Sequence, residues 1–187
     1  SGLGSAGAYR GVKGELYEGG IRVPGILEWP AKIKKHRKTN MPCVTTDYVP
    51  TVLDALGIAL PKDRIYDGIS LMPLIEGKTD KRTEPIGFKC KGMTAWMTER
   101  YKLLRMGTRE PWQLFDMQKD PYETTDLSKA KPEVFKELLG QCGVWVKSCE
   151  KDFRAVLEKY PRGTGLPKDE AATKKEGKKR KDKPKAP

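Results

Sequence analysis

The chain has 187 residues, a formal net charge of +12, and a composition that is 37% hydrophobic and 33% charged. That length fits one domain, or one domain with an appendage, of a soluble protein. No apolar run approaches the roughly 20 residues of a membrane-spanning helix, and no secretory leader pattern opens the sequence. Since the first residue is Ser rather than Met, we expect a processed product or a fragment of a longer chain.

The first distinctive stretch is YRGVKGELYEGGIRVPGILEWP, at residues 9–30. It places one lysine, Lys13, in a loop whose glycines stand at positions 11, 14, 19 and 20. Glycines leave space around a cation and let backbone N–H groups approach a ligand. The apolar run Ile21–Trp29 then predicts a short buried strand.

A helix is expected over Thr45–Gly57. Either threonine at 45 and 46 can cap its start, Pro50 fits its first turn, and Gly57 can close its end. The strand-then-helix order is typical of the edge of an α/β layer. Residues Leu60–Gly77 predict a loop with a short helical turn at Leu71–Ile75. The apolar residues of the helix recur at helical spacing: Val49, Val52, Leu53 and Leu56.

From Pro85 the chain changes to short alternating runs, which predict three or four antiparallel strands. Turn signals separate them at Lys91-Gly92, Glu99-Arg100 and Lys119-Asp120-Pro121. A long helix over Pro132–Tyr160 follows, and its apolar stripe should pack on the sheet. The stripe occupies positions 134, 135, 138, 139, 142, 145, 146, 149, 153, 156 and 157.

Positive charge is concentrated at the end of the chain, where residues 162–187 hold ten Lys or Arg against four Asp or Glu, a net +6. Without aromatic residues, this Lys-rich segment cannot offset its ordering entropy, so we expect a disordered tail. It could bind nucleic acid or another polyanion by counterion release, but a solvating extension is the simpler interpretation. A second basic run, Lys32–Lys38, surrounds His36 with lysines, which disfavour a cation ligand there.

The four cysteines are expected to be buried or partly buried free thiols. None forms a Cys-x-x-Cys pair, so no zinc site is predicted. Cys142 and Cys149 would lie about 10 Å apart along a helix, which is too far for a disulfide. The other two are Cys43 and Cys90.

Several motifs, taken in order over about residues 7–160, resemble the C-terminal portion of the sulfatase family, which is arylsulfatase-like and has the alkaline-phosphatase-like superfold. The first is similar to the family's R-x-x-K-G…E-G-G-x-R-x-P…W-P segment. The matching segments are RGVKG at 10–14, YEGGIRVP at 17–24, WP at 29–30, TDYVPTVLDALG at 46–57, DGISLMPLIEG at 67–77 and LFDMQKDPYE at 114–123.

The resemblance implies an α/β fold class: the C-terminal part of an alkaline-phosphatase-like fold, with a small antiparallel sheet covered by a long helix and a disordered basic tail. We accordingly divide the chain into three parts. Residues 1–80 would end the catalytic α/β domain with the glycine loop, strand and helix. Residues 81–161 would form the sheet-plus-helix subdomain, and residues 162–187 the tail.

The resemblance also implies a sulfuric-ester hydrolase with a formylglycine nucleophile and a calcium or magnesium ion. In the family, the lysine matching Lys13 contacts the sulfate, where a fixed cation stabilises the charge on the sulfuryl oxygens. Arg10 is a second candidate, either as an additional cation or to orient the loop. Glu18 and Arg22 are expected to form a structural ion pair. Composition alone would favour an ordinary surface lysine at Lys13.

The sequence departs from a complete enzyme in three ways. No cysteine begins the C-x-P-x-R motif from which formylglycine is made, no Asp-Asp pair is present, and no Asp-Asn-Gly precedes the glycine loop. We therefore expect the nucleophile and the metal ligands upstream of Ser1, none in this chain, and no turnover by this chain alone.

The expected partner is a sulfated small molecule or a sulfated glycan, and a periplasmic, secreted or lysosomal-type compartment would fit the family. Two other functions stay open. One is a phosphatase, phosphodiesterase or phosphonate hydrolase of the same superfold. The other is a non-catalytic basic module that binds polyanions.

Overall fold

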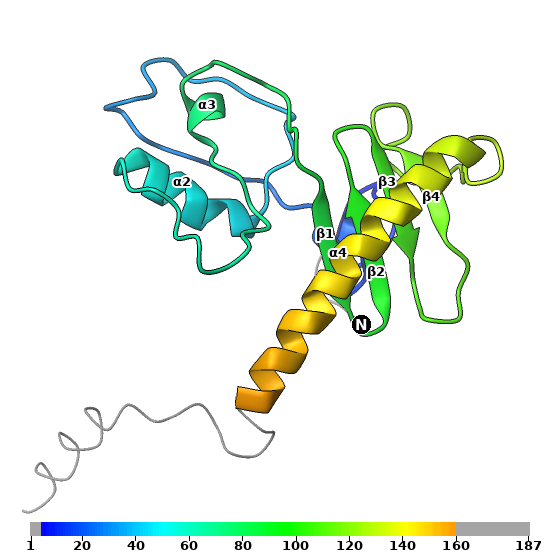
Figure 1. The fold of residues 1–187 in the computed structure, drawn as a ribbon. Helices are drawn as coiled ribbons and strands as arrows, with labels where there is room; N and C mark the ends of the chain where they lie inside the picture. Colours follow the sequence, from blue (N-terminus) through cyan, green and yellow to red (C-terminus); the bar gives the residue numbers. More distant parts are fainter. Residues whose placement is uncertain (1–4, 160–187) are drawn as a thin grey trace, which may run out of the picture. The chain divides into compact units, whose positions relative to one another are not determined.

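The structure, a computed structural model, describes residues 5–159, with side chains up to Glu158. The chain forms two compact units, Ser1–Gly143 and Val144–Pro187. The predicted Lys-rich tail, residues 162–187, lies outside the described residues. The helices are α1 (Glu18–Ile21), the 3-10 turn η1 (Thr45–Asp47), α2 (Tyr48–Ala55), α3 (Met72–Ile75) and α4 (Pro132–Lys159), and a sheet lies between α3 and α4 in the sequence (Figure 1).

The sheet is an antiparallel meander of four strands in the order β1-β2-β3-β4, which confirms the predicted strands. Its register pairs Phe88 with Ala95, Ala95 with Leu104, and Leu104 with Gln113. The first turn has positive φ at Lys91 (49°) and Gly92 (83°), as a two-residue hairpin loop that follows the strand twist requires. The strands are β1 (Ile86–Cys90), β2 (Met93–Met97), β3 (Tyr101–Arg105) and β4 (Gln113–Asp116).

The two faces of the sheet bury different parts of the chain, because alternate residues of a strand point to opposite faces. One face carries a buried cluster in which Leu16 joins Met93, Ala95, Leu104 and Phe115. The N-terminal segment therefore covers this face, and in Figure 1 it runs behind the sheet as seen there. The sequence predicted a helix as cover, but not this second covering segment.

The opposite face is covered by the first turns of α4, which cross in front of the sheet in Figure 1. Leu138 and Cys142 are buried there, and the Trp96 indole donates a hydrogen bond to Gln141 Oε1 at 3.2 Å. A Pro at the first helical position fits the start of α4, since its missing N–H would be unpaired anyway. The predicted packing of this helix on the sheet is thus confirmed as far as Cys142.

The predicted apolar stripe is wrong towards the end of α4, where Phe153 and Val156 are 55% and 54% exposed. Element lengths explain this. A helix of 28 residues is about 42 Å long, whereas a strand of five residues spans only about 17 Å. The helix is therefore longer than any strand of the sheet.

The predicted helix after residue 45 is confirmed as η1 followed by α2, with Pro50 in the first turn of α2. Gly57 ends it with φ +68°. The Gly57 N–H donates to the Asp54 carbonyl and the Ile58 N–H to the Leu53 carbonyl, the pattern of a Schellman cap. The threonine cap was wrong: the Asp47 carboxylate accepts the Val44 N–H instead, at 2.8 Å.

The strand predicted over Ile21–Trp29 is wrong. Ile21 ends α1, and the residues that follow have no regular structure. Val23, Ile26 and Leu27 are 79%, 97% and 58% exposed. An extended segment becomes a strand only when another strand pairs with it, and no described segment pairs with this one.

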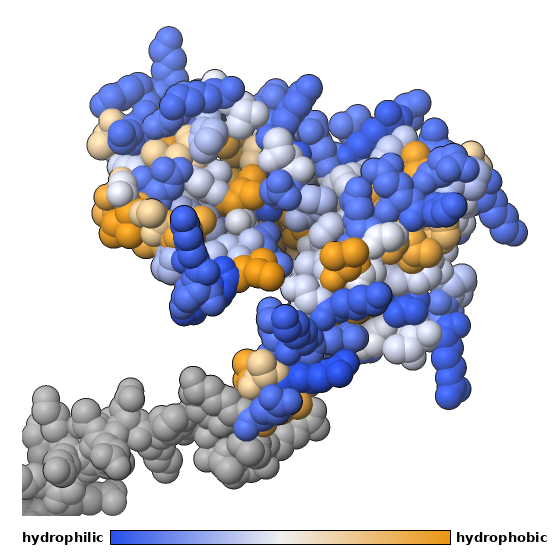
Figure 2. All heavy atoms as spheres, in the orientation of Figure 1, coloured by the Kyte–Doolittle hydropathy of each residue, from blue (hydrophilic) through white to orange (hydrophobic). Residues whose placement is uncertain are grey.

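Much of α2 is also apolar and exposed. Its solvent face carries Tyr48, Val49 and Val52, and Leu56 continues it. Figure 2 shows this region as hydrophobic spheres among hydrophilic ones. Two shallow hollows lie beside α2, one along its exposed face and one against the loop that follows it.

The cysteine prediction holds in part. Cys142 is buried and Cys149 half-buried, but Cys43 and Cys90 are exposed, and none of the four forms a disulfide. Cys90 ends β1 and Cys43 lies in the irregular segment before η1, so neither has an element packed over it. None of the helices within residues 5–159 combines the length and the apolarity that crossing a membrane requires.

Candidate functional site

Lys13 lies at the tip of a tight turn within the segment that we call the lysine loop, residues 9–22. The Glu15 N–H donates to the Val12 carbonyl at 3.0 Å, and the Glu15 carboxylate accepts the Val12 N–H at 3.1 Å. Gly14 has φ +100°, at the position where a type II turn needs positive φ. Lys13 is exposed, and no hydrogen bond or ion pair joins its side chain to any described residue.

Two glycines of the loop are required by close backbone contact. The Gly19 N–H donates to the Arg10 carbonyl at 2.7 Å, and a Cβ on Gly19 would lie 2.3 Å from the Gly11 carbonyl oxygen. A Cβ on Gly20 would lie 2.2 Å from the Glu15 carbonyl oxygen. The glycines therefore let α1 pack directly against the backbone of the turn that carries Lys13.

Beneath the loop, three charged side chains are buried on the same sheet face as the apolar cluster. Lys102 Nζ lies 2.9 Å from Glu18 Oε1 and 2.8 Å from Glu123 Oε1. Glu123 Oε2 accepts the Glu18 N–H at 2.7 Å. The Lys102–Glu123 contact is an ion pair without good hydrogen-bond geometry, since Glu123 Oε1 receives no aligned donor. We call these three residues the buried triad.

Burial raises the pKa of the Glu123 carboxyl above its usual value, although the neighbouring Lys102 ammonium opposes that shift. Glu123 also has φ +57°, a left-handed backbone that a non-glycine residue adopts only under strong local constraint. The triad therefore places a carboxylate where both solvation and backbone preference disfavour it.

Each of the two arginines of the loop contacts one member of the triad. Arg10 Nη1 donates to the Glu123 carbonyl at 3.0 Å, and its guanidinium lies 4.1 Å from the centre of the Tyr17 ring. Arg22 Nη1 lies 3.5 Å from Glu18 Oε2. The predicted Glu18–Arg22 pair is therefore present, but it is longer than the unpredicted contact of Glu18 with Lys102.

Tyr17 completes the attachment of the loop to the sheet. Its hydroxyl donates to Gln113 Oε1 at 3.1 Å, and burial raises the pKa of its phenol. Tyr9, at the start of the loop, lies beneath the Arg22 guanidinium at 4.8 Å and beside the Tyr122 ring at 5.4 Å. The lysine loop is thus held at both ends and in its middle, while its 12–15 turn projects.

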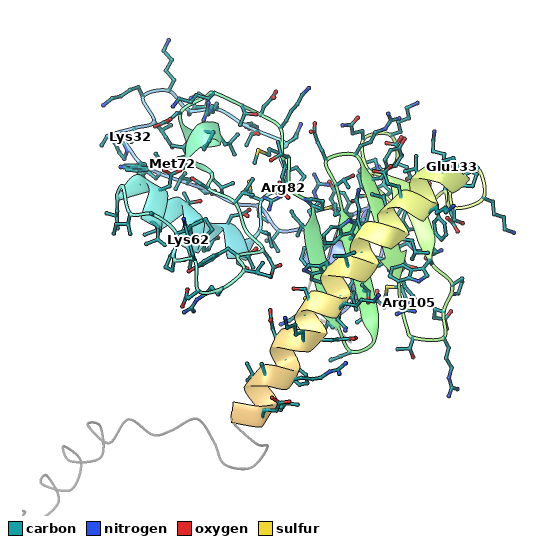
Figure 3. All side chains as sticks on the ribbon, viewed as in Figure 1. Lys32, Lys62, Met72, Arg82, Arg105 and Glu133 are labelled. Carbon is teal, nitrogen blue, oxygen red and sulfur yellow. The ribbon has the colours of Figure 1, made fainter. Side chains whose placement is uncertain are left out.

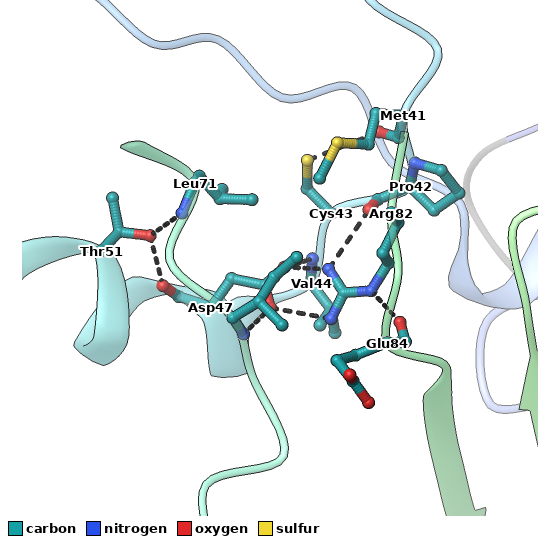
Figure 4. Close-up of polar contacts among 10 residues, drawn as sticks. Met41, Pro42, Cys43, Val44, Asp47, Thr51, Leu71, Arg82 and Glu84 are labelled. Atoms are coloured by element: carbon teal, nitrogen blue, oxygen red, sulfur yellow. Dashed lines mark hydrogen bonds and ion pairs between the residues drawn. The ribbon is translucent and has the colours of Figure 1, made fainter. Parts of the chain in front are cut away.

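A second buried ion pair holds the segments around α2 (Figure 4). Arg82 donates to both Asp47 carboxylate oxygens, at 2.8 and 3.0 Å, and both side chains are at most 1% exposed. Asp47 also accepts the N–H groups of Val44 and Ile69. Every lone-pair direction of this carboxylate thus has a donor, and we call the Asp47–Arg82 pair the α2 clamp.

The motifs around α2 hold the segments next to the clamp together. A Cβ on Gly68 would lie 2.1 Å from the Thr46 carbonyl oxygen. The Thr51 hydroxyl donates to the Asp47 carbonyl and accepts the Leu71 N–H. The Ser70 hydroxyl donates to Asp54. Arg82 reaches the clamp from the segment between α3 and β1 (Figure 3).

The structure brings Lys13 and Arg10 into one loop, but it gives them different surroundings. Lys13 projects, whereas Arg10 is engaged by a carbonyl and an aromatic ring. Within the described part of the chain, no cluster of three His, Cys, Asp or Glu side chains could hold a metal ion. Sequence reasoning missed Lys102 and Glu123, although a lone lysine on the apolar face of a strand was a readable signal.

Comparisons with known proteins match this region. The family model described as "N-sulphoglucosamine sulphohydrolase, C-terminal" matches residues 12–141. Human steryl-sulfatase is 51% identical over 78 residues, covering 42% of this chain and 13% of that protein. Arylsulfatase H of Canis lupus familiaris is 29% identical over 192 residues, covering 85% of this chain and 34% of that protein.

Solved structures share the fold. A Bacteroides thetaiotaomicron structure, BT33336S-sulf, described under the metabolism of multiple glycosaminoglycans, has a TM-score of 0.63 and 27% identity, covering 74% of this chain and 32% of that one. Ps i-CgsB has a TM-score of 0.65 and 24% identity, covering 82% and 37%. The chain spans between 13% and 37% of the length of the curated relatives and solved structures named here.

Proposed function

Because this chain belongs to the sulfatase family, we propose that it supplies the C-terminal part of a sulfuric-ester hydrolase and contributes Lys13 to its active site. One observation carries the assignment of Lys13. Its ammonium group projects from an anchored turn without an ion-pair partner among the described residues, and the matching lysine of the family contacts sulfate. A cation in a fixed position is what a reacting sulfuryl group requires.

The chemistry expected of Lys13 is electrostatic. As the S–O bond of a sulfate ester breaks, negative charge on the sulfuryl oxygens and the leaving oxygen must be stabilised. An ammonium group is a compact charge on a flexible stem, suited to reach one oxygen. For Arg10 we propose the second of its two predicted roles, orienting the loop, which its contacts with Glu123 and Tyr17 support.

The family's formylglycine and its calcium or magnesium ion would supply the nucleophile and the Lewis acid. The residues described in this chain do not form a site for the metal. We therefore assign both groups to the part of the enzyme that this chain does not contain, and the present residues are expected only to bind and orient the sulfate.

We propose a sulfated small molecule or a sulfated glycan as substrate. The similarity to steryl-sulfatase supports the first and that to BT33336S-sulf, with its glycosaminoglycan context, supports the second. The lysine loop is compatible with both, because a sulfate oxygen presents the same charge to Lys13 on either skeleton.

The test is the Lys13→Ala substitution in the complete sulfatase that contains this chain, with formylglycine confirmed by mass spectrometry. We expect kcat/KM for a chromogenic aryl sulfate to fall on the order of 10²-fold, the scale of losing one charge-stabilising group. Lys62→Ala is the matched control, since Lys62 is an exposed lysine of the loop after α2 (Figure 3).

A change below about threefold on Lys13→Ala would contradict the assignment of Lys13. The same preparations are also assayed with an aryl phosphate and a phosphonate ester. These assays test the alternative that the enzyme is a phosphatase, phosphodiesterase or phosphonate hydrolase. Faster release of phosphate or phosphonate than of sulfate would contradict the sulfatase proposal itself.

A further inference from the structure

Burying the triad costs desolvation free energy at a position of the sheet where apolar side chains would also complete the core. Lys102 shares its sheet face with Leu104 and Phe115, and its side chain is fully buried. Removing a charge from water costs several kcal/mol, and a buried ion pair often stabilises a fold no better than apolar residues of the same volume. A role beyond stability is therefore indicated.

Lys102 and Glu123 both make polar contacts with the lysine loop, to which the third member of the triad, Glu18, belongs. Glu123 accepts the Glu18 N–H and, through its carbonyl, the Arg10 guanidinium. Lys102 binds the Glu18 carboxylate, which also faces Arg22. The triad thus fixes the loop at residues 10, 18 and 22, on both sides of the turn that carries Lys13.

The polar contacts of the buried Lys102 and Glu123 side chains are complete only when the loop is in place, because Glu18 supplies the second carboxylate to Lys102 and an N–H to Glu123. The triad holds one positive and two negative charges, and the loop arginines bring two further positive charges to its rim. If the loop moved away, Glu18 would leave Lys102, and the Lys102–Glu123 pair would lose its hydrogen-bonded neighbour. The loop position in which Lys13 projects is therefore the one that satisfies the buried carboxylates.

We infer that Lys102 and Glu123 are positioning residues for Lys13: they hold the lysine loop on the sheet so that its ammonium group presents a fixed charge to sulfate. This inference rests on the proposed function of Lys13. A misplacement of about 1 Å can lower a rate on the order of 10²-fold, so residues that never touch the substrate can control its turnover.

The experiment compares Lys102→Met with Arg82→Met in the complete sulfatase. Arg82 belongs to the α2 clamp and is equally buried, but it makes none of its described contacts with the lysine loop. Four quantities are measured for each variant: the melting temperature, kcat for an aryl sulfate, KM for the same substrate, and amide hydrogen exchange of residues 9–22.

We expect both variants to lower the melting temperature. Lys102→Met alone should accelerate amide exchange in residues 9–22 and lower kcat/KM at least roughly tenfold at a temperature where both variants are folded. If Lys102→Met does not fold, Glu123→Gln replaces it, because this variant keeps the side-chain shape and one acceptor for the Glu18 N–H. It should change loop exchange and kcat/KM in the same direction, by a smaller factor. Lys102→Arg, which keeps a positive charge, should recover part of the lost activity.

Equal losses of activity in the Lys102→Met and Arg82→Met variants, with unchanged exchange in the lysine loop, would overturn the inference. Lys13→Ala is measured in the same series to separate this result from failure of the proposed function. If Lys13→Ala has no effect while the loop exchange of Lys102→Met increases, the sulfate role of Lys13 fails. The triad is then a loop anchor without the positioning role that we infer.

Discussion

The lysine loop and the α2 region use the same two devices for different ends. Each has a buried ion pair that joins distant segments, and each has a glycine whose missing Cβ admits a backbone carbonyl. In the α2 region both oxygens of the Asp47 carboxylate are satisfied within the fold, and both charged side chains of the clamp are buried. In the lysine loop the same devices anchor a turn whose exposed Lys13 ammonium group has no ion-pair partner among the described residues. The two regions are therefore built alike. The lysine loop is the candidate functional one because it presents a charged group that its own anchoring contacts do not use.

The largest expected effects come from breaking either ion pair. Arg82→Met leaves Asp47 buried without its guanidinium, and Lys102→Met leaves the buried Glu123 carboxylate without a cation and Glu18 with Arg22 alone. Loss of one partner of a buried pair typically costs about 3–5 kcal/mol, so both variants should unfold at clearly lower urea concentrations in equilibrium unfolding followed by circular dichroism. A loss below about 1 kcal/mol in either variant would show that its site is hydrated in solution.

The glycines give the next largest effects and separate the two regions by function. Gly19→Ala and Gly68→Ala each place a methyl group about 2.3 and 2.1 Å from a backbone oxygen, and relieving such overpacking costs about 1–3 kcal/mol. Only Gly19→Ala should also lower aryl sulfate turnover, because it displaces the turn that carries Lys13. Turnover reduced equally by Gly68→Ala, at matched stability, would remove the distinction between the regions.

An effect of similar size is expected from the apolar segment that follows the lysine loop. Ile26 is almost fully exposed here, and we expect the remainder of a complete sulfatase to cover it, as family membership and the short span of this chain suggest. Ile26→Ser in the complete enzyme should then cost about 1.5–3 kcal/mol, the value of burying one such side chain. Glu28→Ser is the control, and equal melting temperatures for the two variants would show that this segment faces solvent.

The smallest effect concerns a half-exposed ion pair, which serves as a reference for the buried ones. Burial pushes the pKa of Asp116 up, but hydrogen bonds from Arg100 outweigh it, so the net shift is downward. Because the pKa of Asp116 is lower in the folded state than in the unfolded state, its ionised form stabilises the fold at pH values above the unfolded-state pKa, near 4. This contribution is lost as the pH falls through the folded-state pKa. Arg100→Ala should therefore flatten the dependence of stability on pH below about 5, as urea titrations from pH 3 to 7 would detect.

The elements that could be predicted from sequence are those with local causes. Alternating apolar and polar residues, with turn residues between the runs, predict the antiparallel strands. Lys91-Gly92, for example, marks the tight hairpin between the first two strands. Helical spacing with Pro50 and Gly57 likewise predicts α2 and its end. The fold class followed from motifs in order, and family membership confirms it. The domain boundaries at residues 80 and 161 stay a prediction.

The parts that could not be predicted depend on partners distant in the sequence. The strand over Ile21–Trp29 failed because pairing is decided by another strand and not by apolar residues alone. The position of the lysine loop on the sheet depends on a contact between Glu18 and Lys102, 84 residues apart. The ion pair of Glu123 with Lys102 likewise joins residues 21 positions apart, which no local pattern reveals.

Lys102 also has a consequence for how the sheet assembles. It lies in β3, between β2 and β4, and a shift of β3 by one residue would turn every side chain of that strand to the other face. The ammonium group would then meet the first turns of α4, while Leu103 would lie against two carboxylates. We expect the shifted strand to be less stable, because the Lys102 ammonium group would lie unpaired on one face of the sheet and the carboxylates of the triad would lose their cation on the other. A single buried polar residue selects the alignment of a coiled coil in the same way. Refolding of Lys102→Met, followed by stopped-flow fluorescence, should then show an additional slow phase from misaligned chains, and unchanged single-exponential refolding would exclude this error-checking role.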